Sequence, residues 1–97
     1  MDILSITRSQ ADGIVCYADL SNDEETTLVW YDPATLRGEV YEISFSDDTI
    51  EIEKGDIAPD MKFDFTPFEK ITLEMFDNLS AEINQTISEA EVVEEGL

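Results

Sequence analysis

The spacing of apolar residues changes once along this chain of 97 residues, near residue 66, and this change constrains the fold more than any other feature. Up to that point apolar side chains recur at every second position, as in strands, and afterwards at every third or fourth position, as in a helix. We expect one α+β domain over residues 1–97, because a chain of this length has no room for a second. The predicted architecture is a four- to five-stranded antiparallel β-meander with one long C-terminal helix packed on one face. Its boundaries are strands over about 2–53, a connection over 54–65, a helix over about 67–90 and a frayed acidic tail over 91–97.

Polar turns divide the first half of the chain into alternating segments. The predicted strands span about residues 4–7, 14–20, 26–31, 39–46 and 50–53. The third is apolar on both faces, which is typical of a central strand. Its Trp30 and Tyr31 point to opposite faces, so one aromatic ring lies on the face away from the helix, where it either anchors a partner or is covered by the 54–65 connection. A reversal follows over residues 32–38, because Pro33 pre-sets a turn dihedral and Gly38 tolerates a positive φ.

The register of the last hairpin follows from a two-residue turn at Asp47 and Asp48. Apolar side chains then pair on one face, Phe45 with Ile50 and Ile43 with Ile52, while Ser44 faces Glu51 and Glu42 faces Glu53 on the other. Like charges directly across a ladder are destabilising. A sequence optimised for stability alone would not be expected to keep the pair of glutamates.

Two segments of the connection, Lys54-Gly55-Asp56 and Pro59-Asp60, are expected to interrupt regular secondary structure. A short edge strand is possible after them, with Met61, Phe63 and Phe65 alternating. Thr66-Pro67-Phe68-Glu69 then forms a capping box with proline at the first helical position, which predicts the helix start. The apolar stripe of that helix comprises Phe68, Ile71, Thr72, Met75, Phe76, Leu79, Ile83, Ile87 and Ala90. Such a stripe is wide enough to lie across the sheet.

The charge balance excludes several classes of function. The chain has 24 acidic and five basic residues, a net charge of −19, and no histidine. Direct binding to nucleic-acid phosphates needs clustered lysine and arginine, and His-dependent hydrolysis needs an imidazole. The four glycines are too far apart for a phosphate loop, and one small domain offers little room for a catalytic cleft. We expect no catalytic residue and no cofactor.

One acidic loop resembles the start of a calcium-binding loop, with oxygen donors at Asp19, Ser21, Asp23 and Glu25. The pattern fails further on, because Glu24 occupies the glycine position and Trp30 that of the bidentate glutamate. The prediction is a solvated turn and no metal site.

The single cysteine, Cys16, lies between apolar neighbours and has no partner for an internal disulfide, which favours a buried thiol and a reducing, cytoplasmic setting. No basic region precedes an apolar stretch at the N-terminus, and no apolar run approaches the roughly 18 residues of a membrane span. An anionic surface is also repelled by anionic headgroups. We expect no membrane association.

The acidity extends over the whole surface. From Ile71 onward there are seven acids and no base. A compact chain of this length has a diameter of about 32 Å, and duplex DNA carries 19 charges over a similar length of about 32 Å. In size, acidity and lack of catalytic residues the chain resembles the small DNA-mimic proteins of phages and mobile elements, including anti-restriction proteins, uracil-DNA glycosylase inhibitors and anti-CRISPR proteins.

This resemblance implies a stoichiometric inhibitor that blocks the basic nucleic-acid-binding channel of a host defence complex, in the host cytoplasm and without touching nucleic acid itself. The most specific function that the resemblance implies is an anti-CRISPR role. The candidate partner contacts are Glu42, Asp47, Asp48, Glu51 and Glu53 on the hairpin, Asp23, Glu24 and Glu25 on the preceding loop, and Glu74, Asp77 and Glu82 on the helix. We expect the hairpin and the helix flank to form one continuous face.

A structural or assembly module is the alternative. Leu73 lies off the main apolar stripe, and Val92 and Val93 can extend it in a homodimer. Such a module would oligomerise or dock through its helix or an edge strand.

Overall fold

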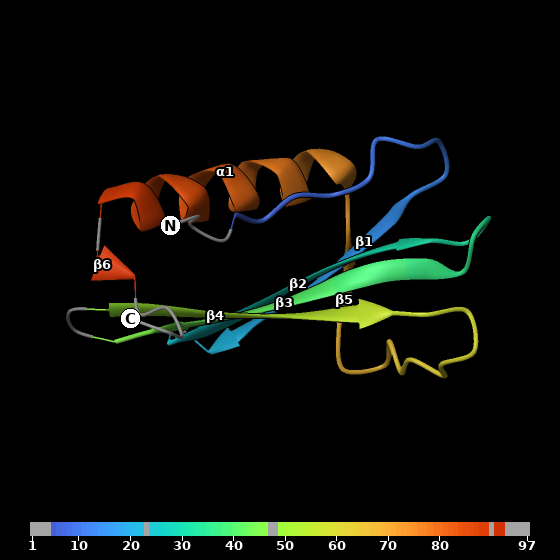
Figure 1. Cartoon of the computed structure of the whole chain (residues 1–97), viewed down its shortest axis with the longest axis horizontal. Helices are drawn as coiled ribbons and strands as arrows, with labels where there is room; N and C mark the ends of the chain where they lie inside the picture. Colours follow the sequence, from blue (N-terminus) through green and yellow to red (C-terminus); the bar gives the residue numbers. More distant parts are fainter. Residues whose placement is uncertain (1–4, 23, 47–48, 90, 93–97) are drawn as a thin grey trace.

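The computed structural model describes residues 5–22, 24–46, 49–89 and 91–92. The elements are β1 (Val15–Asn22), β2 (Glu25–Asp32), β3 (Arg37–Phe45), β4 (Thr49–Ile57), β5 (Glu69–Ile71), α1 (Leu73–Glu89) and β6 (Glu91–Val92). Five strands form an antiparallel sheet in the order β4-β3-β2-β1-β5, and the two-residue β6 joins β4 in parallel at the far edge. The helix α1 lies over one face of this sheet (Figure 1). The predicted α+β class, with an antiparallel sheet and one C-terminal helix, is confirmed.

The core lies between α1 and the sheet. Its most buried side chains come from the three central strands, from α1 and from the segment that precedes β1: Ile6, Cys16, Leu28, Tyr41, Ile43 and Phe76. Ile83 and Ile87 continue the buried stripe of the helix, as its spacing predicts. Full burial of one such aliphatic or aromatic side chain stabilises the fold by about 1.5–3 kcal/mol. The described residues have a radius of gyration of 13.5 Å.

The register of the central sheet agrees with the alternation in the sequence. β2 pairs with β1 on one side and with β3 on the other, and Leu28 and Val29 are 0% exposed on its two faces, so the central position is confirmed. Along β3 and β4 the pairs are Ile43 with Ile52, Phe45 with Ile50, Glu42 with Glu53 and Ser44 with Glu51, all as predicted. The turn residues Asp47 and Asp48 lie outside the described residues.

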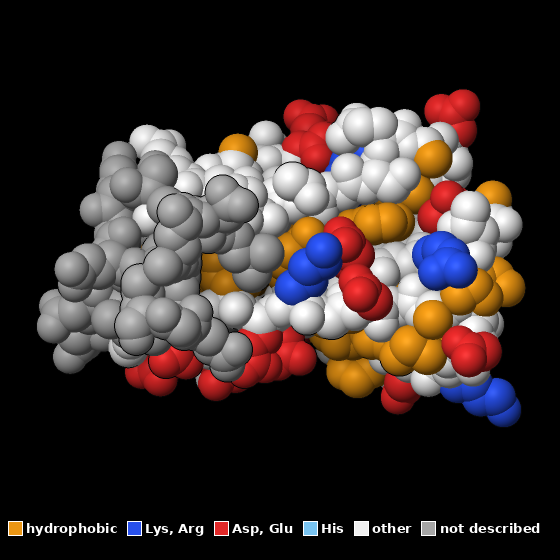
Figure 2. Space-filling model, in the orientation of Figure 1, with side chains coloured by type: hydrophobic (Ala, Val, Ile, Leu, Met, Phe, Trp, Pro, Cys, Tyr) orange, Lys and Arg blue, Asp and Glu red, His pale blue; other side chains and the backbone are white. Residues whose placement is uncertain are grey.

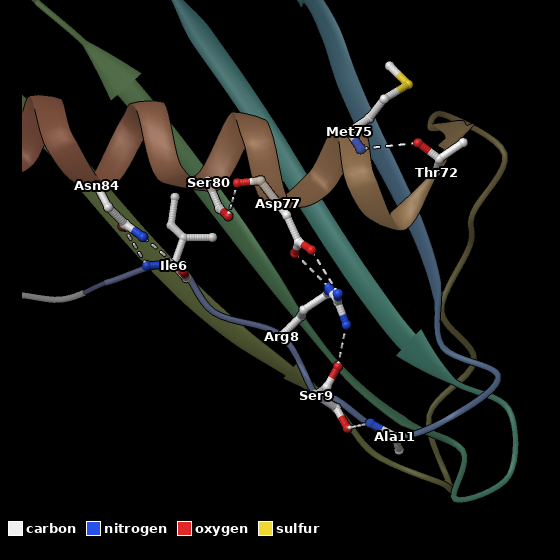
Figure 3. A network of polar contacts seen from close by, with 9 residues as sticks. All are labelled: Ile6, Arg8, Ser9, Ala11, Thr72, Met75, Asp77, Ser80 and Asn84. Atoms are coloured by element: carbon white, nitrogen blue, oxygen red, sulfur yellow. Dashed lines mark hydrogen bonds and ion pairs between the residues drawn. The ribbon is translucent and has the colours of Figure 1, made fainter.

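The predicted first strand over 4–7 is wrong over residues 5–7, and Leu4 lies outside the described residues. From residue 5 the chain runs along α1 instead of pairing in the sheet (Figure 3). The Ile6 backbone exchanges its hydrogen bonds with the side chain of Asn84: Ile6 N–H donates to Oδ1 at 2.8 Å, and Nδ2 donates to the Ile6 carbonyl at 3.0 Å. An amide side chain thus satisfies the backbone groups that a neighbouring strand would have bonded.

The breaker assigned to Lys54-Gly55-Asp56 is also wrong, because β4 continues through it to Ile57. The Gly55 position is open, with no atom within 4 Å of an added Cβ, and Gly55 pairs with Val40 of β3. In the turn between β2 and β3 the residue with a positive φ is Leu36, at 60°. Gly38 serves a different need: a Cβ there would lie 2.2 Å from the Trp30 carbonyl oxygen.

The edge strand and the helix start both lie later than predicted. Residues 61–65 form no strand, and β5 follows at Glu69–Ile71, where it pairs with Cys16, Tyr17 and Ala18 of β1. The helix begins at Leu73, with Thr72 as its cap: Thr72 Oγ1 accepts from Met75 N–H at 3.1 Å. Because residues 69–71 gain sheet hydrogen bonds, the capping box at Thr66 is not used. Thr66 instead hydrogen-bonds to Asp64 through both its N–H and its hydroxyl, within a turn.

The connection over residues 58–68 crosses the sheet face opposite α1 (Figure 1). We call it the aromatic connection, because the Phe63 ring stacks on Phe68 and meets Phe65 edge to face within it. The Phe65 ring lies 4.6 Å from that of Tyr17 and 5.2 Å from that of Tyr31. Of the two interpretations for Tyr31, coverage by the connection is therefore confirmed.

Candidate partner-binding face

The outer face of the sheet, away from α1, is divided into two halves. The aromatic connection covers the end that carries Tyr17 and Tyr31, and the other end is open. Two cross-strand rows cross the open end: Glu25, Ser44 and Glu51 in one, and Thr27, Glu42 and Glu53 in the next. We call this surface the acidic face and define it by its four carboxylates, Glu25, Glu42, Glu51 and Glu53.

Strand geometry sets the dimensions of the acidic face. Neighbouring strands are about 4.8 Å apart and residues two apart on one strand about 6.8 Å, so four carboxylates project from an area of roughly 10 by 7 Å. Four charges of duplex DNA occupy about 7 Å of its axis. Along the strand direction, the face thus carries about as many charges per unit length as duplex DNA carries along its axis. A shallow hollow of about 160 Å³ lies among the four glutamates, with Thr26, Thr27, Ile43 and Ser44 also lining it.

Within the described residues, the basic side chains that form ion pairs bind acids outside the acidic face. Arg8 pairs with Asp77 of α1, and Lys54 pairs with Glu39 on the sheet face under the helix. Neither pair involves the acidic face. In Figure 2, Asp and Glu side chains gather along the lower edge of the molecule, beneath the sheet, and hydrophobic side chains lie beside them. The acidic face therefore combines four like charges without an ion-paired base in the described part of the chain.

The structure brings together some of the predicted contact residues and separates others. Glu25, Glu42, Glu51 and Glu53 lie side by side, and Glu24 is exposed in the turn that leads into β2. Asp23, Asp47 and Asp48 lie outside the described residues. Glu74, Asp77 and Glu82 are on α1, which covers the opposite face of the sheet, so the hairpin and the helix flank do not form one continuous face. The physical reason is alternation: Ile43 and Ile52 point to the helix, and their glutamate neighbours therefore point away from it.

Asp77 has a structural partner. Its two carboxylate oxygens accept from Nε and Nη2 of Arg8 at 2.7 and 2.8 Å. This hydrogen-bonded pair lowers the pKa of the Asp77 carboxyl, against a smaller opposing effect of burial. Of the three predicted helix contacts, Asp77 is thus the one already neutralised within the chain.

Sequence reasoning missed a polar cluster around Glu39. Its Oε1 accepts from Trp30 Nε1 and from the Tyr41 hydroxyl, both at 3.0 Å, and its Oε2 lies 2.6 Å from Lys54 Nζ. Burial opposes ionisation of Glu39, but these three donors outweigh it and keep the pKa of Glu39 below its ordinary value. The pairing of Trp30 with Glu39 across β2 and β3 was the signal that could have revealed it. The cluster satisfies the polar atoms of two core aromatics, and we assign it to the fold.

An apolar groove lies between β5 and the first turn of α1. It encloses about 470 Å³, and its lining includes Ile14, Val15, Cys16, Lys70, Ile71, Thr72, Leu73 and Met75. Leu73 and Met75 are 38% and 45% exposed there. Cys16 is itself buried, and burial raises the pKa of its thiol to about 11.

The loop that resembles the start of a calcium site forms hydrogen bonds within itself. Asp19 accepts from the Ser21 N–H and hydroxyl at 3.1 and 2.7 Å, and Asp23 lies outside the described residues. In the described part of the chain no three acidic or thiol side chains are grouped to hold an ion. The one described helix is too short and too polar to cross a lipid bilayer.

Comparisons with protein-family models, with curated protein sequences and with solved structures gave no match.

Proposed function

We propose that this protein is a non-enzymatic inhibitor that presents its acidic face to the basic nucleic-acid-binding channel of a partner protein. The type of activity is DNA mimicry against a host defence system, of which anti-CRISPR and anti-restriction inhibitors are the examples. One observation carries the proposal: Glu25, Glu42, Glu51 and Glu53 form a two-row array on three adjacent strands, with no basic side chain paired to them in the described chain. The free thiol of Cys16 agrees with action in a reducing cytoplasm.

The array suits this task for two physical reasons. Its backbone is part of a hydrogen-bonded sheet, so binding orders only the four side chains and costs little conformational entropy. In addition, the free protein carries the repulsion between Glu42 and Glu53, which directly face each other. Lysine or arginine side chains of a partner relieve that repulsion on binding, and the net charge of −19 steers the encounter.

The test is capture followed by competition. The protein is immobilised and exposed, at low and high salt, to a lysate that contains a nuclease or Cas complex; the captured partner is purified and titrated with duplex DNA. We expect DNA to compete with the protein, and the association rate to fall by about tenfold or more as salt screens the steering. Capture without competition by nucleic acid, or binding insensitive to salt, contradicts the proposal.

A matched pair of variants separates the acidic face from acidity in general. One variant replaces Glu25, Glu42, Glu51 and Glu53 with glutamine. The control neutralises four exposed acids that are not candidate contacts, Asp12, Asp56 and Asp60 to asparagine and Glu69 to glutamine, so both variants carry −15 instead of −19. We expect the first to lose binding and the control to retain most of it. Equal losses would mean that net charge, and not the array, binds the partner.

A second candidate function, an assembly module, is favoured by the apolar groove beside β5, where Leu73 and Met75 are exposed. Of the tail residues suggested for such an interface, Val92 pairs with Ile50 of its own chain, and Val93 lies outside the described residues. Light scattering over a range of concentrations decides between the two. A concentration-independent dimer that is lost in the double variant Leu73→Ser, Met75→Ser supports the module, and a monomer under all conditions rejects it.

A further inference from the structure

Residues 5–9 lie along α1 without joining any element. No backbone–backbone hydrogen bond links them to the rest of the described chain, whereas every central strand is bonded on both sides. Their polar contacts to other elements run through side chains (Figure 3). We call residues 5–9 the N-terminal strap.

Two side chains of α1, two turns apart, hold the strap. Asn84 clamps the Ile6 backbone with the two hydrogen bonds described above, and Asp77 holds the Arg8 guanidinium in a bidentate pair. The Arg8 side chain also donates from Nη1 to the Ser9 carbonyl at 2.9 Å, within the strap itself.

The apolar attachment of the strap is a single side chain. Ile6 is 2% exposed and belongs to the core cluster of the helix and sheet, whereas Ser5 and Thr7 are exposed. The Arg8 side chain is also largely covered, at 12% exposed, where it pairs with Asp77. A segment held by one buried apolar residue, one ion pair and a few side-chain hydrogen bonds loses less on release than the whole fold loses on unfolding, and its backbone gains freedom. Segments of this kind open locally, at a lower free energy than the fold as a whole.

We infer that the N-terminal strap opens as a unit while the sheet and α1 stay folded, uncovering the apolar seat of Ile6 and releasing the Asp77 carboxylate. In the open state Asp77 joins the exposed acids Glu74 and Glu82 of the same helix, so the outer side of α1 becomes more negative. The strap is thus a conformational device built on a different surface from the acidic face, and it does not depend on the proposed function.

Native-state hydrogen exchange tests the inference on the unmodified chain. The Ile6 amide reports the strap, and the Leu28 amide, in the central strand β2, reports global unfolding. We expect the protection factor of Ile6 to be at least about 100-fold lower than that of Leu28. Because a local opening exposes little surface, Ile6 exchange should also be nearly independent of low urea concentrations, while Leu28 exchange accelerates with urea. If both amides exchange with the same free energy and urea dependence, the strap is part of the global fold and the inference fails.

A variant pair then checks which contact closes the strap. Arg8→Gln removes the bidentate pair with Asp77, in which the Arg8 side chain is 12% exposed and the Asp77 side chain 51% exposed. Arg37→Gln removes the same charge from the distant start of β3. We expect Arg8→Gln to lower Ile6 protection by about two- to fivefold and Arg37→Gln to leave it unchanged. Equal effects of the two substitutions would mean that the Arg8–Asp77 pair does not hold the strap closed.

Discussion

Neutralising Glu53 should stabilise the fold, because its carboxylate is surrounded by like charges. Glu42 lies directly across from it on β3, and Glu51 lies two residues away on the same strand face. Directly opposed Cβ atoms are about 5 Å apart, and residues two apart on a strand are separated by about 6.8 Å. Glu53→Gln keeps the size and shape of the side chain and removes only its charge.

The expected gain follows from these distances. Two unit charges about 6–7 Å apart in water repel each other by roughly 0.6–0.7 kcal/mol, so the two neighbours together contribute about 1.3 kcal/mol before screening. At physiological salt, with a Debye length of about 8 Å, roughly half of this remains. A gain of about 0.6 kcal/mol in a domain of this size raises Tm by about 2–5 °C. At 1 M salt, where the Debye length is about 3 Å, the gain should fall to about 0.2 kcal/mol.

Urea denaturation followed by the fluorescence of Trp30 measures the change at both salt concentrations. Glu82→Gln, an exposed neutralisation on α1, is the control and should give a smaller gain. Combining Glu53→Gln with Glu42→Gln should give less than the sum of the single gains, by about 0.3 kcal/mol, because the first substitution already removes the repulsive pair. A gain that does not change with salt, or the absence of any gain, would refute the argument that the acidic face stores repulsion.

Three further predictions concern the interior. Gly38→Ala should lower stability by about 1–3 kcal/mol in urea denaturation, because the new methyl group meets the Trp30 carbonyl oxygen at 2.2 Å, and Gly55→Ala, where the space is open, should not. The pKa of Glu39 is lower in the folded protein than its ordinary value of 4.5, so its ionisation stabilises the fold above pH 4.5, and this stabilisation is lost as the pH falls through the folded pKa. Glu39→Gln should therefore make the urea midpoint less sensitive to acid. The same substitution should lower the free energy of unfolding by about 1.5–3 kcal/mol at pH 7. The Cys16 thiol, buried and with its pKa raised to about 11, should react with a maleimide at pH 8 more than tenfold more slowly in the native state than in urea; comparable rates would contradict its burial.

The sheet register was predictable because local signals agree with one another. Alternation along β3 and β4 and a short turn between them leave one register that buries Ile43 and Ile52 together, and a shift by one residue would expose both. The same alternation places Glu42 opposite Glu53. It also places Glu51 opposite Ser44 on the same face, so three of the four carboxylates of the acidic face follow from the sequence alone.

The fourth carboxylate, Glu25, needed the tertiary structure. Glu25 joins the array only through the register of β2 against β3, which places it beside Ser44. The choice between capping signals was also non-local: Thr66 and Thr72 both suit a helix start, and the edge of β1, which pairs with residues 69–71, favours the later one. Similarly, Ile6 lies in a segment with the alternation of a strand. Its backbone N–H and carbonyl are hydrogen-bonded to the side chain of Asn84, 78 residues away, instead of to a neighbouring strand.

The sequence by itself determined the α+β class, the hairpin register, the buried thiol and the uncompensated charge, because each follows from local periodicity or from composition. Only the tertiary structure decided which carboxylates share a surface and which form ion pairs. Those outcomes depend on which strand or helix lies next to each carboxylate in the fold. Alternation then separated the acids of the sheet from those of α1, because side chains next to a core residue on a strand must point to the opposite face.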